Sequence, residues 1–198
     1  MTGQLMARPF PTPGSLVELA HRELQRAANG TLDQILALGD IHELPRPWEP
    51  ESCPAKLRGE IWAWLDQVVD WLNTDYCWDP DGLIPACWPH HPHLVHEIAV
   101  LADERRIAGQ AFTSDLLEEW HRYALPSFND RLRSRIRSHC DDSHQPWPAK
   151  GRQTRYRDGA GDRSRRFADD LLSSRGEGVS RTTAQLALID LITGEITT

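Results

Sequence analysis

The segment 54–73 restricts the fold of this chain more than any other part of the sequence. Its apolar residues recur every three or four positions, as on one face of an α-helix; they are Leu57, Ile61, Leu65, Val68 and Leu72. Trp62, Trp64 and Trp71 flank this stripe. Burial of one tryptophan side chain contributes on the order of 2–3 kcal/mol. We therefore predict that this helix forms the centre of a tryptophan-rich helical core.

Further helices are predicted on both sides of this segment. Ser15 and Glu18 have the spacing of a capping box, which marks the start of a helix near 15–29. Gly30 is suited to a left-handed residue at the end of that helix. The other predicted helices cover 32–38, 92–109 and 114–139, and Pro126 either ends or kinks the last of them.

These elements indicate a mainly α fold: a small helical bundle with a Trp-rich core, a flexible basic segment and a C-terminal β-hairpin or short helix. Four parts are expected along the chain. They are a loosely attached N-terminal helical arm with a proline-rich connection (1–50), a helical core domain (51–140), a flexible Arg-rich segment (141–180) and the C-terminal element (181–198).

The predictions for the last two parts depend on different features of the sequence. The segment 141–180 has little apolar periodicity, so it offers no burial to offset the entropy of ordering. We expect it to be mobile, with one short helix at most, around 167–172. At the C-terminus, β-branched residues flank Thr193-Gly194 as in a hairpin, while an amphipathic helix over 182–192 fits the same residues.

Composition and the N-terminus limit the class of protein. No apolar run approaches the roughly 20 residues that span a bilayer. The first residues lack the basic start, apolar stretch and cleavage site of a secretory signal. Four cysteines in 198 residues are too few for a disulfide scaffold. We therefore expect a cytoplasmic protein with no membrane partner, whose cysteines are thiols or metal ligands.

Histidines and cysteines gather in the segment Cys87-Trp-Pro-His-His-Pro-His-Leu-Val-His96. A helix that starts at Pro92 would bring His93 and His96 to one side. The candidate metal ligands are Cys77, Cys87, His93 and His96. Structural zinc sites usually take cysteines in close pairs, however, and Cys77 is ten positions from Cys87. We therefore expect no cofactor, with the histidines in a solvated first helical turn, and keep zinc as the alternative.

Other chemistry-bearing residues have a structural interpretation. The cluster His139-Cys-Asp-Asp-Ser-His144 lies at a predicted helix end, where histidine favours the C-terminal dipole. Asp79 and Asp81 are interpreted as turn formers, and His121 as a boundary residue beside a core tryptophan. No nucleophile elbow, phosphate-binding glycine loop, zinc protease motif or kinase motif is present. The sequence therefore gives no positive support for an enzymatic activity.

The segment 150–166 carries seven positive and two negative side chains, against a net charge of -7 for the whole chain. Arginine with interleaved aromatic residues suits phosphate contacts and base stacking. A solvating linker, or binding to the acidic rest of the protein, is the alternative. The candidate nucleic-acid-binding residues are Lys150, Arg152, Arg155, Tyr156, Arg157, Arg163, Arg165 and Arg166.

The segments Gly82–Leu101 and Glu119–Phe128 share a recognisable order of features. A tryptophan lies in a Pro/His loop, a helix follows, and a second tryptophan helix ends near a proline. Over residues 76–137 this order resembles a family of uncharacterised actinobacterial proteins associated with plasmids, integrative elements and phage-like regions. The resemblance implies an accessory role on a mobile genetic element and supplies no catalytic residue.

The expected function is therefore that of a non-enzymatic accessory protein that binds nucleic acid through its Arg-rich segment. The expected partner is nucleic acid or a protein of a DNA transfer or maintenance complex. Two alternatives remain. The chain could be a protein-interaction adaptor whose residues 184–198 add to the edge of a partner's sheet, or a zinc-stabilised module.

Overall fold

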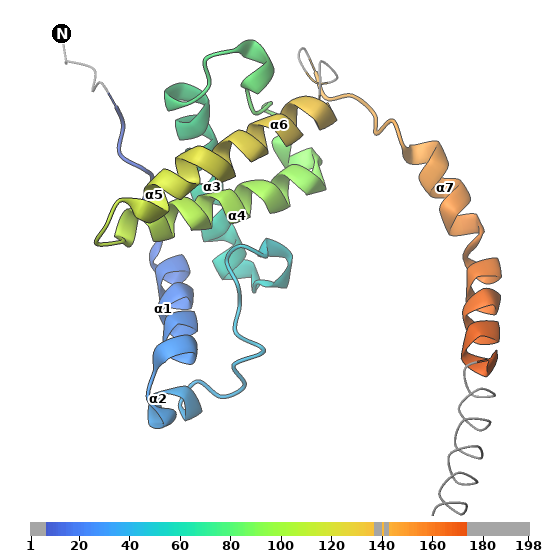
Figure 1. The fold of residues 1–198 in the computed structure, drawn as a ribbon, viewed down its shortest axis with the longest axis horizontal. Helices are drawn as coiled ribbons and strands as arrows, with labels where there is room; N and C mark the ends of the chain where they lie inside the picture. The colour runs from blue at the N-terminus through green and yellow to red at the C-terminus, as the bar shows by residue number, and fades with distance from the viewer. Residues whose placement is uncertain (1–6, 137–139, 141–142, 174–198) are drawn as a thin grey trace, which may run out of the picture. The chain divides into compact units, whose positions relative to one another are not determined.

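The structure is a computed structural model that describes residues 7–136, 140 and 143–173 (Figure 1). The chain divides into two compact units, Met1–Gln145 and Pro146–Thr198, and each is described by itself. The described residues form helices and contain no strand, so the predicted mainly α fold is confirmed. None of the described helices is both long enough and apolar enough to cross a membrane. The C-terminal hairpin or helix predicted for 181–198 lies outside the described residues.

Helix α3 (Ala55–Asp75) is the centre of the first unit, as its sequence predicts. All five residues of its apolar stripe are buried. Trp64 and Trp71 are buried with them, at 2% and 4% exposure. Trp62 is 37% exposed and lies at the boundary, beside the buried Trp88. The tryptophan-rich core is thus confirmed, although one of the three flanking indoles stays at the surface.

Four other helical segments belong to the first unit. They are α1 (Ser15–Asn29), α2 (Leu32–Leu36), α4 (Pro92–Gln110) and a helical stretch made of α5 (Asp115–Glu119), a π-helical turn (Trp120–Ala124) and α6 (Leu125–Ile136). Figure 1 shows α4 beside α5 and α6, and α3 crosses α4. Their facing side chains complete the core, among them Leu94, Ile98, Leu101, Phe128 and Leu132.

Pro126 neither ends nor sharply breaks the last helix, because the π-helical turn precedes it. A proline in a regular α-helix lacks one N–H donor and collides with the carbonyl four residues earlier. Here the Leu125 N–H donates to the carbonyl of Trp120, five residues earlier, which widens the helix at this point. The turn also buries Trp120, whose indole N–H donates to the carbonyl of Leu101 at 3.1 Å.

The start and the end of α1 differ from the prediction. Gly14, not Ser15, caps the helix, and no side chain of its own segment caps it. Instead the carboxylate of Glu60 on α3 accepts a hydrogen bond from the Leu16 N–H at 2.8 Å. Gly30 has a φ of -76°, so it is not left-handed. A tertiary contact thus replaces the local capping box.

The N-terminal arm is fastened to the core, so the prediction of a loose attachment is wrong. The indole N–H groups of Trp64 and Trp71 donate to the carbonyls of Pro11 and Arg8, each at 3.0 Å. The Arg8 side chain pairs with Asp75 at 2.8 Å. Sequence periodicity does not detect such contacts. The arm is an extended segment without an apolar face of its own, and buried indole N–H groups hold it to the core.

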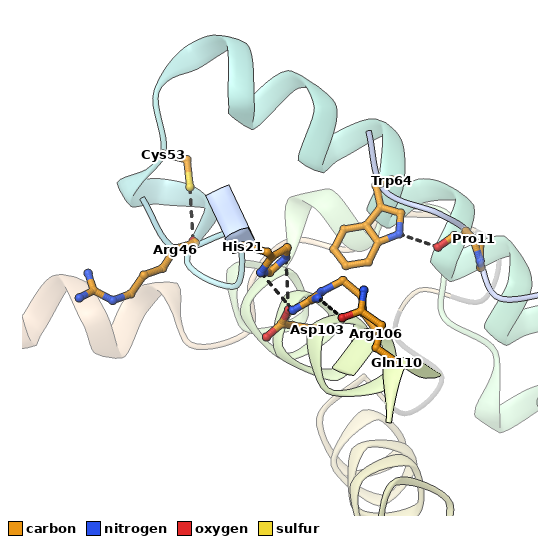
Figure 2. Close-up of polar contacts among 8 residues, drawn as sticks. All are labelled: Pro11, His21, Arg46, Cys53, Trp64, Asp103, Arg106 and Gln110. Atoms are coloured by element: carbon orange, nitrogen blue, oxygen red, sulfur yellow. Dashed lines mark hydrogen bonds and ion pairs between the residues drawn. The ribbon is translucent and has the colours of Figure 1, made fainter. Parts of the chain in front are cut away.

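A polar cluster joins α1 to α4 (Figure 2). Arg106 donates to Asp103 at 2.9 Å, to the amide oxygen of Gln110 at 3.1 Å and to Nδ1 of His21 at 3.1 Å. The other ring nitrogen of His21 lies 3.4 Å from the Asp103 carboxylate. Burial, followed by the charge of Arg106, lowers the pKa of His21 to about 4. His21 is therefore a neutral, buried link between two helices at neutral pH.

Candidate metal centre

Two cysteines and two histidines of the first unit converge on one point. The ligand atoms of Cys87, His91, Cys140 and His144 all lie within 4.8 Å of one another. Cys140 is buried, Cys87 and His91 are half-buried, and His144 is exposed. Two thiols and two imidazoles are the ligand set of many structural zinc sites. This part of the fold could therefore hold a metal ion.

A tight turn positions the first pair of ligands. Pro85 and Pro89 prevent a longer regular helix here, and a single 3₁₀ turn, Trp88–His90, separates Cys87 from His91. The His91 N–H donates to the carbonyl of Trp88 at 3.0 Å, and α4 starts at the next residue. Trp88 is buried and anchors the turn in the core. The second pair, Cys140 and His144, follows α6 with the same spacing of four positions.

The distances fit tetrahedral coordination closely. Nε2 of His91 lies 3.4 Å from the sulfur of Cys87 and 3.4 Å from the sulfur of Cys140. Zinc bonds of about 2.3 Å to sulfur and 2.0–2.1 Å to nitrogen, at tetrahedral angles, place these atoms about 3.5 Å apart. His91 Nε2 thus lies at the distance from each sulfur that a shared zinc ion would require. The ring of His144 lies with its centroid 5.0 Å from that of His91 and completes the set.

Burial shifts the pKa values of His91 and Cys87 in opposite directions, and this affects how each residue would bind a metal. It lowers the pKa of the His91 imidazole, and His144, His93 and His90 lower that pKa further. It also raises the pKa of the Cys87 thiol, and Cys140 acts in the same direction. Zinc binds a neutral imidazole and a thiolate. His91 is therefore already in its ligand form, whereas Cys87 would release a proton on binding.

The structure separates most of the metal candidates that the sequence suggested. Only Cys87 belongs to the cluster. The thiol of Cys77 donates to the carbonyl of Asp79 at 3.1 Å, and Nδ1 of His96 lies 3.6 Å from the carboxylate of Glu51. His93 is next to His91 in space, but its own Nε2 is buried without a hydrogen-bond partner.

Sequence reasoning missed His91, Cys140 and His144. It searched for two close cysteines, and it interpreted 139–144 as a helix end. A signal was nevertheless present, because the spacing Cys-x₃-His occurs twice, at Cys87–His91 and at Cys140–His144. Each such pair needs a partner pair from elsewhere in the chain to complete a tetrahedral site. The 49 positions between His91 and Cys140 hide that pairing from any local pattern.

The second unit contains the predicted nucleic-acid-binding residues, and they lie on helices. Helix α7 (Lys150–Asp158) is followed by a turn at Gly159 and by further helix over 160–173. Gly159 keeps the helical hydrogen-bond pattern, since its N–H donates to Arg155 and its carbonyl accepts from Arg163. The expectation that 141–180 contains one short helix at most is therefore wrong for these residues. The arginines of this segment favour helix by local propensity, which requires no apolar face, although Gly151, Gly159 and Gly161 oppose it.

The arginines of this helix are arranged by its repeat. If the repeat of 100° per residue continued unchanged through the turn at Gly159, four of them would fall within about 80° around the axis: Arg152, Arg155, Arg163 and Arg166. Three of these side chains are exposed. Arg163 is half-buried, with its guanidinium 3.7 Å from the centroid of the Tyr156 ring. Arg165 pairs with Asp162 on another side. Lys150 and Arg157 are exposed and also lie outside this group of four.

His121, interpreted from the sequence as a boundary residue beside a core tryptophan, makes contacts within the fold. Its Nε2 lies 3.1 Å from the hydroxyl of Tyr76, and the two rings stack. Comparison of the chain with protein family models, curated proteins and solved structures finds no match. The two candidate sites are therefore interpreted from their own chemistry.

Proposed function

We propose that this chain is a non-enzymatic accessory protein that binds nucleic acid through the helix 150–166. The observation that carries the proposal is the group of exposed or half-buried arginines Arg152, Arg155, Arg163 and Arg166 on the two helical stretches that flank Gly159. Guanidinium groups donate several hydrogen bonds to phosphate oxygens, and each contact releases bound counterions. A row of arginines along these helical stretches is therefore an electrostatic match for a phosphate backbone.

The dimensions of the row suit a double helix. From Arg152 to Arg166 the helix rises about 21 Å, at 1.5 Å per residue. This length corresponds to about six base pairs at 3.4 Å each, and the major groove is wide enough for an α-helix. Tyr156 has one face covered by Arg163, so its other face is the one available for stacking on an unpaired base.

We further propose that Cys87, His91, Cys140 and His144 bind zinc and that this centre stabilises the first unit. Zinc supplies here a tetrahedral link between the 87–91 turn and the segment after α6. Four protein ligands leave no open position for water or substrate, which is the arrangement of structural rather than catalytic zinc. A reducing cytoplasm, the proposed location, would keep both thiols available as ligands.

The resemblance over 76–137 supports the biological setting that we propose for nucleic-acid binding. It implies an accessory role on a mobile genetic element, where nucleic acid or a protein of a DNA transfer or maintenance complex would be the partner. The stretch that carries this likeness includes Cys87 and His91, so the proposed zinc centre would hold part of the shared region in place.

Salt-dependent binding tests the function directly. The full-length protein is titrated against a 20-base-pair duplex and a 20-nucleotide single strand between about 50 and 200 mM salt. The variant R152Q/R155Q/R166Q is compared with R22Q/R26Q/R122Q, which removes the same charge from exposed arginines of the first unit. The expected result is a loss of affinity and a salt slope shallower by about 2.7 in the first variant alone.

Two outcomes would overturn the proposal. One is binding that does not change with salt, since phosphate contacts release counterions. The other is equal affinity of the two triple variants, because general charge would then account for the binding. Zinc content, measured on the same preparations by mass spectrometry, is a separate readout that leaves the nucleic-acid result interpretable.

A further inference from the structure

A second cavity of the first unit, of about 750 Å³, lies apart from the metal centre. It is partly open to solvent and is lined by α1, the N-terminal arm, Trp48 and the C-terminal end of α4. Its volume falls within the range of small-molecule sites, which is roughly 300–1,000 Å³. Aromatic and aliphatic side chains form part of its wall, among them Phe10, Leu24 and Trp48.

The charges around this cavity are unequal. Three arginines line it, Arg22, Arg105 and Arg106, against one carboxylate, Glu18. Arg106 is already neutralised, because it pairs with Asp103 at 2.9 Å (Figure 2). His21 also lines the cavity and contributes no charge at neutral pH, since burial holds its pKa at about 4. Arg22 and Arg105 therefore leave the wall with an excess of positive charge.

Arg105 is oriented without a counter-ion. Its guanidinium carbon lies 5.1 Å from the centroid of Phe10 and 5.7 Å from those of Trp71 and Trp120. Its Nε is the one nitrogen of this side chain that is buried without a hydrogen-bond partner. Three aromatic rings thus hold the Arg105 cation at the wall of the cavity.

The end of this side chain lies at the cavity. An added Cβ at Gly109, which lines the cavity, would lie 2.9 Å from Nη1 of Arg105. Since Nε is buried, a ligand can reach only the two terminal nitrogens. A planar guanidinium binds a carboxylate through two parallel hydrogen bonds. A flat apolar body attached to that carboxylate would contact Trp48 and Phe10.

We propose that this cavity binds a small aromatic carboxylate, with Arg105 as the group that holds the carboxylate. The terminal nitrogens of Arg105 are not buried, and among the described residues no acceptor is seen for them, so they are available to a carboxylate. The proposal is independent of nucleic-acid binding and of zinc, since none of its residues belongs to the 150–166 helix or to the Cys/His cluster.

The test uses the full-length protein and two probes of the same shape, 2-naphthoate and its neutral amide. Binding is followed through the indole N–H signal of Trp48 in ¹H–¹⁵N NMR spectra, assigned with a W48F sample. We expect naphthoate to bind with a Kd below about 1 mM and the amide to bind at least about tenfold more weakly. Inorganic phosphate, which lacks the apolar body, should not compete.

Three variants assign the effect to Arg105. R105K keeps the positive charge but lacks the planar guanidinium that donates two parallel hydrogen bonds. It should weaken naphthoate binding about tenfold or more. G109A keeps Arg105 and adds a methyl group against Nη1, so it should also weaken binding while the helix remains intact. R26Q removes an exposed arginine of α1 that does not line the cavity and should change the Kd less than about threefold.

The proposal is overturned by any of three results. These are a naphthoate Kd weaker than about 1 mM, equal binding of the acid and the amide, and unchanged affinity in both R105K and G109A. In each of these cases Arg105 would serve only as a cation packed against core aromatic rings. Competition by phosphate at the same concentration would assign the cavity to inorganic anions and would equally refute an aromatic carboxylate.

Discussion

Replacing Cys140 by serine provides the sharpest test of the metal centre. C140S keeps the size of the side chain but removes one of two thiolate ligands from the Cys/His cluster. The matched control is C77S, because Cys77 lies outside that cluster and its hydrogen bond to the carbonyl of Asp79 is one a serine can also make. Both variants lose one thiol from a chain with four free cysteines.

The size of the effect follows from the loop that zinc would close. Cys87 and Cys140 are 53 positions apart. A cross-link across a loop of this length lowers the entropy of the unfolded chain by an amount worth about 4 kcal/mol. Mass action gives a similar figure, since free zinc at about 1,000 times its Kd stabilises a folded protein by about 4.1 kcal/mol. We therefore expect zinc to add about 4 kcal/mol to the free energy of unfolding.

Urea denaturation with and without zinc measures this increment. Wild-type protein and C77S are expected to contain one zinc ion per chain and to lose about 4 kcal/mol of stability when a chelator removes it. C140S is expected to contain less than one equivalent and to show little change with the chelator. The comparison within each protein separates the metal effect from any cost of placing serine at a buried position.

The opposite pattern would refute the interpretation of the cluster. If purified wild-type protein contained no stoichiometric zinc and took none up, the four side chains would not be a zinc site. If C77S and C140S lost the same zinc-dependent increment, Cys140 would not be a ligand. In either case the 3.4 Å contacts around His91 would be ordinary thiol–imidazole hydrogen bonds.

Three further predictions test the core. Trp64→Ala should cost about 3–5 kcal/mol in urea denaturation, whereas Trp62→Ala should cost about 1 kcal/mol or less, because only the first indole is fully buried. Gly14→Ala should destabilise, since its Cβ would clash with a carboxylate on α3, while Gly59→Ala has open space in a helix and should stabilise by about 0.5–1 kcal/mol; opposite signs would contradict both. The folded pKa of His21 lies below its unfolded value, so stability should fall as pH decreases from about 6.5 to 4, and His21→Asn should flatten that dependence in parallel urea titrations.

The central helix was predictable because its burial is periodic. All five stripe residues of α3 are buried as the spacing indicates. The indole N–H groups carry information that the spacing lacks. Trp64 and Trp71 fasten the N-terminal arm through hydrogen bonds to Pro11 and Arg8, and no local pattern shows which carbonyls they bind. The direction of a helix face follows from the sequence, but its polar partners depend on tertiary structure.

The basic helix was missed for the opposite reason. Apolar periodicity detects helices that bury one face, and 150–166 has no such face. Helix propensity acts locally and is favourable for Arg, Gln and Ala. Neighbouring turns add contacts of their own, such as the guanidinium of Arg163 over the ring of Tyr156. Propensity does not indicate helix either, because Gly151, Gly159 and Gly161 each cost about 1 kcal/mol relative to alanine and offset the arginines.

The metal centre depends on a contact between distant segments, so its ligands could be predicted only in pairs. Cys87 was a candidate, whereas Cys140 and His144 were interpreted as a helix end. Each Cys-x₃-His pair alone is compatible with an ordinary turn. Their convergence requires that α6 return past the start of α4, which the packing of Phe128 and Leu132 against the core brings about. The hydrophobic core thus positions a site whose own residues do not specify the pairing.

Three histidines of the first unit are engaged in contacts within the fold, which agrees with the binding role that we propose. A general base needs a free nitrogen near a reacting group. Arg106 donates to Nδ1 of His21, and His121 contacts the hydroxyl of Tyr76. His91 is directed at two thiols. These three imidazoles hold segments of the first unit together, and a four-ligand zinc site would do the same. The groups suited to an external partner are therefore guanidiniums, those of the 150–166 helix toward phosphates and that of Arg105 toward a carboxylate.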